Sequence, residues 1–274
     1  MTAARAPVLP LAYYEGFLDA LMADERIRVI TFADLAWTRL DRRDKHYPRE
    51  WKRWQKRADR DAIYVLLQHD VDAAPERTTA VLRLEAERGL RSNVMVFNRR
   101  HDRPRLAQEG ALEFTPYDID VPLLQELERE GFVVGYHCSA VEQALWDLER
   151  ARAVFADDVR ELRKHFDIRF FNPHGGVPGP AGVNNNSIDP PRVGVRWVSN
   201  RFGARFNAAY SDGRLTARSL DELDLRAFVR TWKPGKRYRI LTHPQYYGAT
   251  EPLEQFRDVE WYAALFDVST RPSG

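Results

Sequence analysis

Histidine and aspartate side chains follow directly after short apolar runs of this sequence. The run from Ile63 to Leu67 leads into Gln68-His69-Asp70-Val71-Asp72, which places three ionisable groups within four positions. Such groups are costly to bury at the end of a strand unless a metal ion, a proton partner or solvent meets them. We therefore expect a chemical site at this strand end.

The same pattern returns at three later points in the chain, at Gly135-Tyr136-His137-Cys138, Asn172-Pro173-His174-Gly175 and Leu241-Thr242-His243-Pro244. Four of the seven histidines thus lie at expected strand ends. Functional groups of a parallel α/β barrel gather at the carboxyl ends of its strands. Carboxylates and imidazoles that converge there suit a divalent metal with an accessory acid and base. A purely structural cluster is the alternative.

Hydrophobic periodicity predicts the elements that would position these residues. Helical patterns cover Leu11 to Met22 and, after Thr31, Phe32 to Leu40. Seven short apolar runs are typical of strands: Ile63 to Leu67, Asn93 to Phe97, Phe132 to Tyr136, Arg169 to Phe171, Val195 to Ser199, Arg205 to Tyr210 and Tyr238 to Thr242.

Helical signals separate the earlier strands. One helix is expected from Pro75 to Gly89 and another from Val121 to Glu130, with Asp120 as its cap. A third opens with Ser139-Ala-Val-Glu142, which has the form of a capping box, and its apolar spacing continues to Phe166. The segment from Ala181 to Pro191 is expected to be a loop.

This alternation predicts an α/β fold, a single-domain incomplete or distorted (β/α)7-type barrel. Residues 61–274 would form the barrel, and residues 1–60 would form a helical segment packed on it. With 44% hydrophobic residues, seven Trp and fourteen Phe, the 274-residue chain can fill a large core.

Composition limits the binding partners and the cellular compartment that we expect for this protein. A formal charge of +2 gives no reason to expect a nucleic-acid partner, and we interpret the basic stretch Arg42 to Arg60 as a solvated or pocket-rim segment. The single cysteine, Cys138, forms no intramolecular disulfide and fits a reducing compartment. No segment has the length of an apolar membrane span or of an export signal. We therefore expect a cytoplasmic protein that binds neither nucleic acid nor membrane.

Taken in order, these motifs resemble the polysaccharide deacetylase superfamily, carbohydrate esterase family 4, in particular a cytoplasmic branch that opens with H-D-V-D. The resemblance spans Ile63 to Tyr247 and includes Glu85-Ala-Glu-Arg-Gly-Leu-Arg-Ser92 and Tyr210-Ser-Asp212. It implies an incomplete (β/α) barrel that removes N- or O-acyl groups from sugars. The cofactor it implies is a divalent metal, zinc first, with cobalt, nickel or iron as alternatives.

The resemblance also implies roles for single residues. Asp70 matches the general base, Asp72 and His137 match metal ligands, and His243 matches the histidine that protonates the leaving group. The family has a second histidine ligand where this chain has Val141, and we expect His174 to take its place.

The third motif lacks the arginine that steers the base in the family, and His69 or Arg77 could substitute for it. We expect a backbone N–H near Gly175 to help hold an oxyanion. The residues expected to contact substrate are His69, Tyr136, Asn172, Gly175 and Asp212.

Three functions are open at this point. The first is a metal-dependent deacylase whose substrate is a carbohydrate or a small, activated sugar compound. The second is a metal enzyme of different chemistry on the same barrel. The third is a barrel that binds carbohydrate or a protein partner and has lost catalysis. Intact Asp70, Asp72 and His243 argue against the third.

Overall fold

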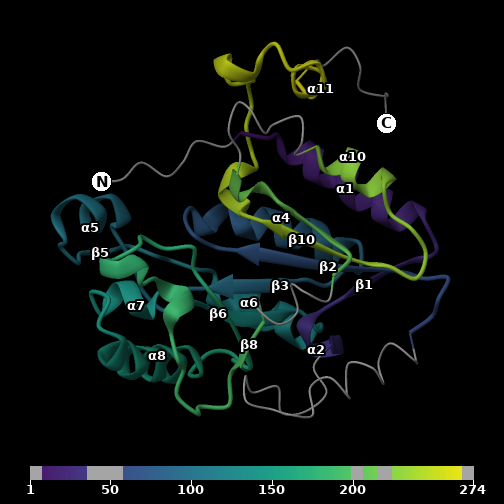
Figure 1. The fold of residues 1–274 in the computed structure, drawn as a ribbon. Helices are drawn as coiled ribbons and strands as arrows, with labels where there is room; N and C mark the ends of the chain where they lie inside the picture. The colour runs from purple at the N-terminus through teal and green to yellow at the C-terminus, as the bar shows by residue number, and fades with distance from the viewer. Residues whose placement is uncertain (1–7, 36–57, 199–205, 215–223, 267–274) are drawn as a thin grey trace.

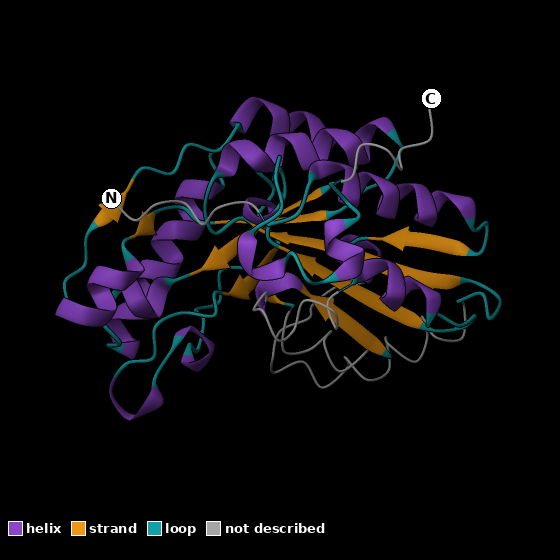
Figure 2. Cartoon of the chain, turned by 90° about the horizontal axis from the view of Figure 1, so that it is seen from above, coloured by secondary structure: helices purple, strands orange, loops and turns teal. Residues whose placement is uncertain are grey.

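A sheet of eight parallel strands forms the centre of the computed structural model, which describes residues 8–35, 58–198, 206–214 and 224–266. The order of its strands is β8-β7-β6-β3-β2-β10-β9, and β1 pairs with the first half of β2. Figure 2 shows the strands side by side, with helices around them. Their bounds are β1 Ile27–Ile30, β2 Ile63–Asp70, β3 Asn93–Val96, β6 Val133–Cys138, β7 Phe170–Pro173, β8 Arg196–Trp197, β9 Ala208–Ser211 and β10 Arg237–Thr242.

The order follows the chain around a barrel that stays open between β8 and β9, since the described residues of these two strands do not pair. This confirms the predicted incomplete α/β barrel. Helices flank the sheet: α1 Leu11–Ala23, α2 Phe32–Leu35, α4 Pro75–Glu87, α5 Arg103–Glu109, α6 Val121–Arg129, α7 Ala140–Gln143, α8 Leu148–Leu162, α10 Leu225–Arg230 and α11 Glu260–Ala263. A two-stranded ribbon, β4 Arg100–His101 with β5 Phe114–Thr115, stands apart from the main sheet.

The strand register brings the chemical residues to one edge of the sheet. His69 in β2 pairs with Thr242 in β10, and His137 in β6 pairs with Asn172 in β7. Because all these strands run parallel, their carboxyl ends meet on the side where α5 and α7 lie (Figure 1). The sheet therefore places all four predicted strand ends around one opening.

Two elements differ from the sequence-based expectation. The segment before residue 60, predicted to be helical, also supplies β1 to the sheet. The predicted third helix is two helices, α7 and α8, because Leu145 and Trp146 adopt left-handed backbone conformations with φ of 52° and 64°. The capping box was wrong: the Ser139 side chain caps nothing, and Asp147 instead accepts from two backbone N–H groups at the start of α8.

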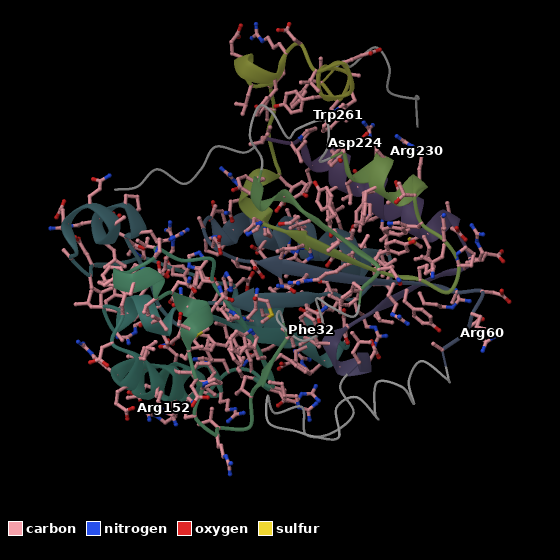
Figure 3. The ribbon with its side chains drawn as sticks, in the orientation of Figure 1. Phe32, Arg60, Arg152, Asp224, Arg230 and Trp261 are labelled. Atoms are coloured by element: carbon pink, nitrogen blue, oxygen red, sulfur yellow. The ribbon has the colours of Figure 1, made fainter. Side chains whose placement is uncertain are left out.

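The chain ends of the described part pack together on one flank of the barrel. The Tyr13 hydroxyl of α1 donates to Asp224, and its ring centroid lies 5.8 Å from that of Trp261 in α11 (Figure 3). On another flank, Phe32 of α2 is buried against Phe170 of β7. The predicted helix after Leu35 and most of the basic stretch from Arg42 lie outside the described residues. None of the described helices combines the length and apolar character of a membrane span.

Candidate metal-dependent active site

A cavity of about 890 Å³ opens at the carboxyl ends of β2, β6, β7 and β10. A volume of this size lies at the upper end of the range of ligand pockets, about 300–1,000 Å³. Seven of the predicted site residues line it: Asp70, Asp72, His137, Asn172, His174, Gly175 and His243. The cavity therefore includes residues from all four strand-end motifs of the sequence. His69 itself does not line it.

Asp72, His137 and His174 form a donor cluster in this cavity. Each offers one ligand atom, and these three atoms lie within 4.8 Å of one another. The Nε2 atom of His137 is 3.0 Å from Asp72 Oδ1, and the Nε2 atom of His174 is 3.6 Å from Asp72 Oδ2. Two imidazoles and a carboxylate at this spacing are a donor set that a zinc-like divalent ion accepts.

The ring nitrogen of each imidazole that points away from the cluster has its own partner. His137 Nδ1 lies 3.1 Å from the carbonyl oxygen of Asn172, and His174 Nδ1 lies 3.3 Å from Glu142 Oε2. Phe97 stacks on the His137 ring at 4.8 Å and meets the edge of the His174 ring. Partners at Nδ1 leave Nε2 of both rings facing the cluster, as metal-binding histidines require.

Electrostatics couple the members of the cluster. Burial works against the charged form of Asp72, but His174 and His137 together hold the pKa of Asp72 well below its usual value. Burial also opposes the charged form of His174, yet the Asp72 carboxylate raises the pKa of His174 to about 9. The charges of Asp72 and His174 thus stabilise each other, and a divalent cation would compete with the proton on His174.

Asp70 sits beside this cluster, and its carboxylate is held by two amides. Gln68 Nε2 donates to Asp70 Oδ1 at 2.6 Å, and Asn172 Nδ2 donates to Asp70 Oδ2 at 2.9 Å. Gln68 is itself fixed by Arg239 of β10, whose Nη2 donates to Gln68 Oε1 at 2.7 Å. Asp70 Oδ2 lies 3.7 Å from His137 Nε2, so the carboxylate faces the place where an ion would bind.

Neither residue proposed from the sequence to steer Asp70 reaches it. Arg77 donates to the carbonyl oxygen of Gln245. His69 points to the opposite side of β2, where its Nε2 lies 2.9 Å from Glu85 Oε1 and its Nδ1 lies 2.6 Å from Thr242 Oγ1. Successive side chains of a strand alternate between faces, so His69 and Asp70 cannot both face the cavity.

His69 belongs to a buried polar network behind the site. Glu85 accepts from the Tyr14 hydroxyl at 2.5 Å and from the Ser92 hydroxyl at 2.6 Å, in addition to His69. The network links α1, α4, β2 and β10 at the level of Asp70 and His243. Its members have partners of their own, which indicates a structural role for His69 rather than the predicted contact with substrate.

His243 follows β10, the strand next to β2, and its ring approaches the donor cluster at Asp72. Its Nε2 is 3.7 Å from Asp72 Oδ2, and its Nδ1 is 2.5 Å from Asp212 Oδ1. Asp212 also accepts from the His243 backbone N–H at 2.8 Å. Burial acts to lower the pKa of His243, but the Asp212 carboxylate overcomes this effect and raises it to about 10. The buried Asp212 carboxylate therefore favours the protonated form of His243.

Asp212→Asn should lower the pKa of His243, because the substitution removes the negative charge that stabilises the imidazolium. NMR titration of the His243 ring should show a midpoint moved from about 10 toward or below the ordinary histidine value of 6.5. The control is Asp120→Asn, since Asp120 is an exposed cap of α6 and Asn also caps helices. An unchanged His243 midpoint in Asp212→Asn would show that the pair does not set the charge of the ring.

The other residues predicted to contact substrate divide between the cavity and its surroundings. Asn172 and Gly175 line the cavity. Tyr136 does not, because its side chain points into the core and its hydroxyl donates to buried Asp158. Asp212 is fully buried behind His243, so it acts on that ring rather than on a ligand. Cys138 is buried, and burial raises the pKa of its thiol to about 12.

Sequence reasoning missed several residues that shape the site. Glu142, assigned to a capping box, turns inward and accepts from the Val177 backbone N–H at 2.6 Å and from Asn185 Nδ2 at 2.7 Å. Gln68 was quoted only as part of a motif, and Arg239 lies within an expected strand. The available signal for Arg239 was its position between Tyr238 and Ile240, two buried residues of the expected strand.

The architecture and the site together define a parallel (β/α) barrel with a His/Asp donor cluster at its carboxyl-terminal mouth. Similar solved structures are family 4 carbohydrate esterases. An acetyl xylan esterase from Clostridium thermocellum, in complex with a cobalt ion, is 14% identical, with 74% of this chain and 81% of that chain covered and a TM-score of 0.37.

Two further structures have the same family label. A Streptococcus mutans esterase is 15% identical, with 77% and 83% of the two chains covered and a TM-score of 0.36. A family 4 pseudoenzyme from Bacillus anthracis is 12% identical, with 75% and 61% covered and a TM-score of 0.33. No protein-family model matches this sequence, and no curated protein is similar to it.

Proposed function

We propose that this protein is a metal-dependent hydrolase that removes an N- or O-acyl group, acetyl in the first instance, from a sugar or a glycosylated small molecule. The observation that carries the proposal is the arrangement of the cavity: a hydrogen-bonded carboxylate, Asp70, and an imidazole with a raised pKa, His243, each lie 3.7 Å from a member of the donor cluster. Acyl transfer to water needs a base, an acid and an electrophile in this relation.

The residues present fit a divalent metal. Asp72, His137 and His174 would hold it, and Asn172 and Glu142 would orient the two imidazoles through their Nδ1 atoms. His174 then supplies the ligand that Val141, a buried residue of the core, cannot supply. When bound, such an ion polarises an acyl carbonyl and acidifies water, and zinc is our first choice, with cobalt, nickel or iron as alternatives.

Asp70 and His243 would manage the protons. Asp70 would accept a proton from the attacking water, with Gln68 and Asn172 holding the carboxylate in place. His243 would donate a proton to the departing amine or alkoxide, and Asp212 keeps the ring charged and oriented for that step. The two groups line the same cavity, so one acyl group could meet both.

Asp70→Asn tests this function. The variant should retain metal and bind substrate but lose turnover by on the order of 10²–10⁴, because an amide cannot accept the proton from water. The measurement is release of acetate from an acetylated sugar by the zinc-loaded protein, with metal content determined in parallel.

Asp158→Asn is the matched control, since Asp158 is equally buried and hydrogen-bonded but does not line the cavity. If Asp70→Asn lowers the melting temperature as much as this control and keeps its rate, Asp70 is only a structural support. A wild-type protein that binds zinc and sugar but releases no acetate would favour the alternative function, a barrel that binds carbohydrate or a protein partner without catalysis.

A further inference from the structure

Three arginines line the cavity in addition to the proposed catalytic groups. Arg100 lies in β4, Arg103 begins α5, and Arg239 lies in the middle of β10. Arg100 and Arg103 come from the β4–α5 segment at the mouth, whereas Arg239 comes from the sheet itself. Positive charge therefore reaches the cavity from both its rim and its wall.

Carboxylates of the described chain leave this charge largely unmatched. The Arg100 side chain makes no hydrogen bond or ion pair with the described residues, and Arg103 has a long ion pair, with Nε 3.8 Å from Glu142 Oε1, but no hydrogen bond at that atom. Arg239 bonds to the neutral amide of Gln68. The aspartates that line the cavity are Asp70 and Asp72, and a bound divalent cation would cancel their two charges.

Buried donors in the same wall lack acceptors. His101 of β4 is only 4% exposed, yet neither of its ring nitrogens has a hydrogen-bond partner among the described residues. Its nearest carboxylate oxygen, Glu142 Oε1, is 3.7 Å away. The Nε atoms of Arg103 and Arg239 are also buried without acceptors. Buried polar groups normally have hydrogen-bond partners, so we expect each of these nitrogen atoms to bind a ligand atom or a water molecule.

On the basis of the hydrolase function proposed above, we propose that the acylated substrate also carries a phosphate group. Arg100, Arg103 and His101 bind this group at the mouth of the cavity. A phosphate monoester carries close to two negative charges and three acceptor oxygens, which matches several separate donors. A carboxylate needs fewer donors, because one arginine side chain can bind both of its oxygens with two parallel hydrogen bonds. The volume of about 890 Å³ leaves room for this group beside an acylated sugar.

The test compares equilibrium binding of N-acetylglucosamine 6-phosphate, N-acetylglucosamine and N-acetylmuramic acid to the zinc-loaded protein by calorimetry. The Asp70→Asn background prevents turnover during the titration, and the wild type is measured alongside. The phosphorylated sugar should bind roughly tenfold or more tightly than the neutral sugar, because hydrogen bonds between charged groups are the strong ones. Equal affinities for the three sugars would overturn the proposal. Tighter binding of N-acetylmuramic acid, whose lactyl group carries a carboxylate, would show that the site binds a carboxylate rather than a phosphate.

Arginine variants locate the effect. Arg100→Gln and Arg103→Gln should each reduce the preference for the phosphorylated sugar several-fold. Arg105→Gln should leave it unchanged, because Arg105 lies on the same helix but pairs with Glu109 and Glu113 outside the cavity. A preference that survives both variants and disappears in Asp72→Ala would mean that the anion binds the metal, and the proposal would fail.

Binding and catalysis give separate outcomes. A protein that prefers the phosphorylated sugar but releases no acetate keeps the phosphate site and loses the proposed hydrolase function. A protein that releases acetate with equal affinity for all three sugars keeps the hydrolase function and loses the phosphate site. Inorganic phosphate should compete with the phosphorylated sugar and not with N-acetylglucosamine at low concentration.

Discussion

Asp72→Ala should release the metal and abolish hydrolysis. Asp72 is the one carboxylate in the donor cluster, and both Nε2 atoms of His137 and His174 face it. Loss of a negatively charged ligand should leave too weak a site to retain zinc through gel filtration. A divalent metal at this site would contribute several kcal/mol of transition-state stabilisation, so the rate should fall by on the order of 10³ or more. Elemental analysis and acetate release measure the two effects.

The fold should survive this change. The Asp72 side chain is 20% exposed and lies at the rim of the core, so alanine leaves no large cavity. Removing the carboxylate also lowers the pKa of His174, which then stays neutral more readily in the metal-free protein. The control is Asp61→Ala at an exposed position. A variant that keeps one zinc per chain would show that Asp72 is not a ligand.

His243→Ala should lower the rate by on the order of 10²–10⁴ for a substrate with a poor leaving group. An amine or sugar alkoxide needs a proton as it departs, and His243, whose pKa is raised by Asp212, faces the donor cluster. An activated aryl ester needs no such proton, so its hydrolysis should fall much less. Steady-state rates for an N-acetyl sugar and an aryl acetate make the comparison. Equal losses for both substrates would show that His243 positions substrate or binds metal instead.

The dependence of the hydrolysis rate on pH also tests whether His243 is the proton donor. A proton donor works in its charged form, so the rate should fall as the pH rises through the pKa of His243, which Asp212 raises above the ordinary histidine value. His243→Ala should remove this alkaline limb, and Asp212→Asn should move it to lower pH. The limb is read from kcat/KM, which reports the free enzyme. An alkaline limb that stays in place in both variants would assign it to another group.

The sequence predicted the barrel because its seven core strands are compact apolar runs with polar residues at their ends. It also predicted the donor cluster, since Asp72, His137 and His174 lie at the ends of parallel strands, β6 and β7 side by side and β2 separated from β6 by β3. Such strand ends must meet at one edge whatever the loops do. Their metal-binding role stays a prediction.

Other features depended on tertiary contacts that no local pattern carries. β1 contains Arg28 among three apolar residues, and it becomes a strand through pairing with β2. The break before α8 arises because Leu145 and Trp146 take conformations that β-carbons disfavour, while Trp146 donates to the Val177 carbonyl. Gln68 and Arg239 meet across neighbouring strands, so only the sheet register could reveal them.

The Glu85 network has a consequence for how this protein can change in evolution. Tyr14 of α1 donates to the same buried carboxylate that holds His69, one residue before Asp70. Exchange of the first 60 residues with those of a relative would keep the barrel's chemistry only if the incoming helix brought a hydroxyl to the same place. Without it, Glu85 would lose one of three donors in a fully buried setting. We therefore expect that α1 can be exchanged without loss of stability only together with the residues of the Glu85 network that it contacts.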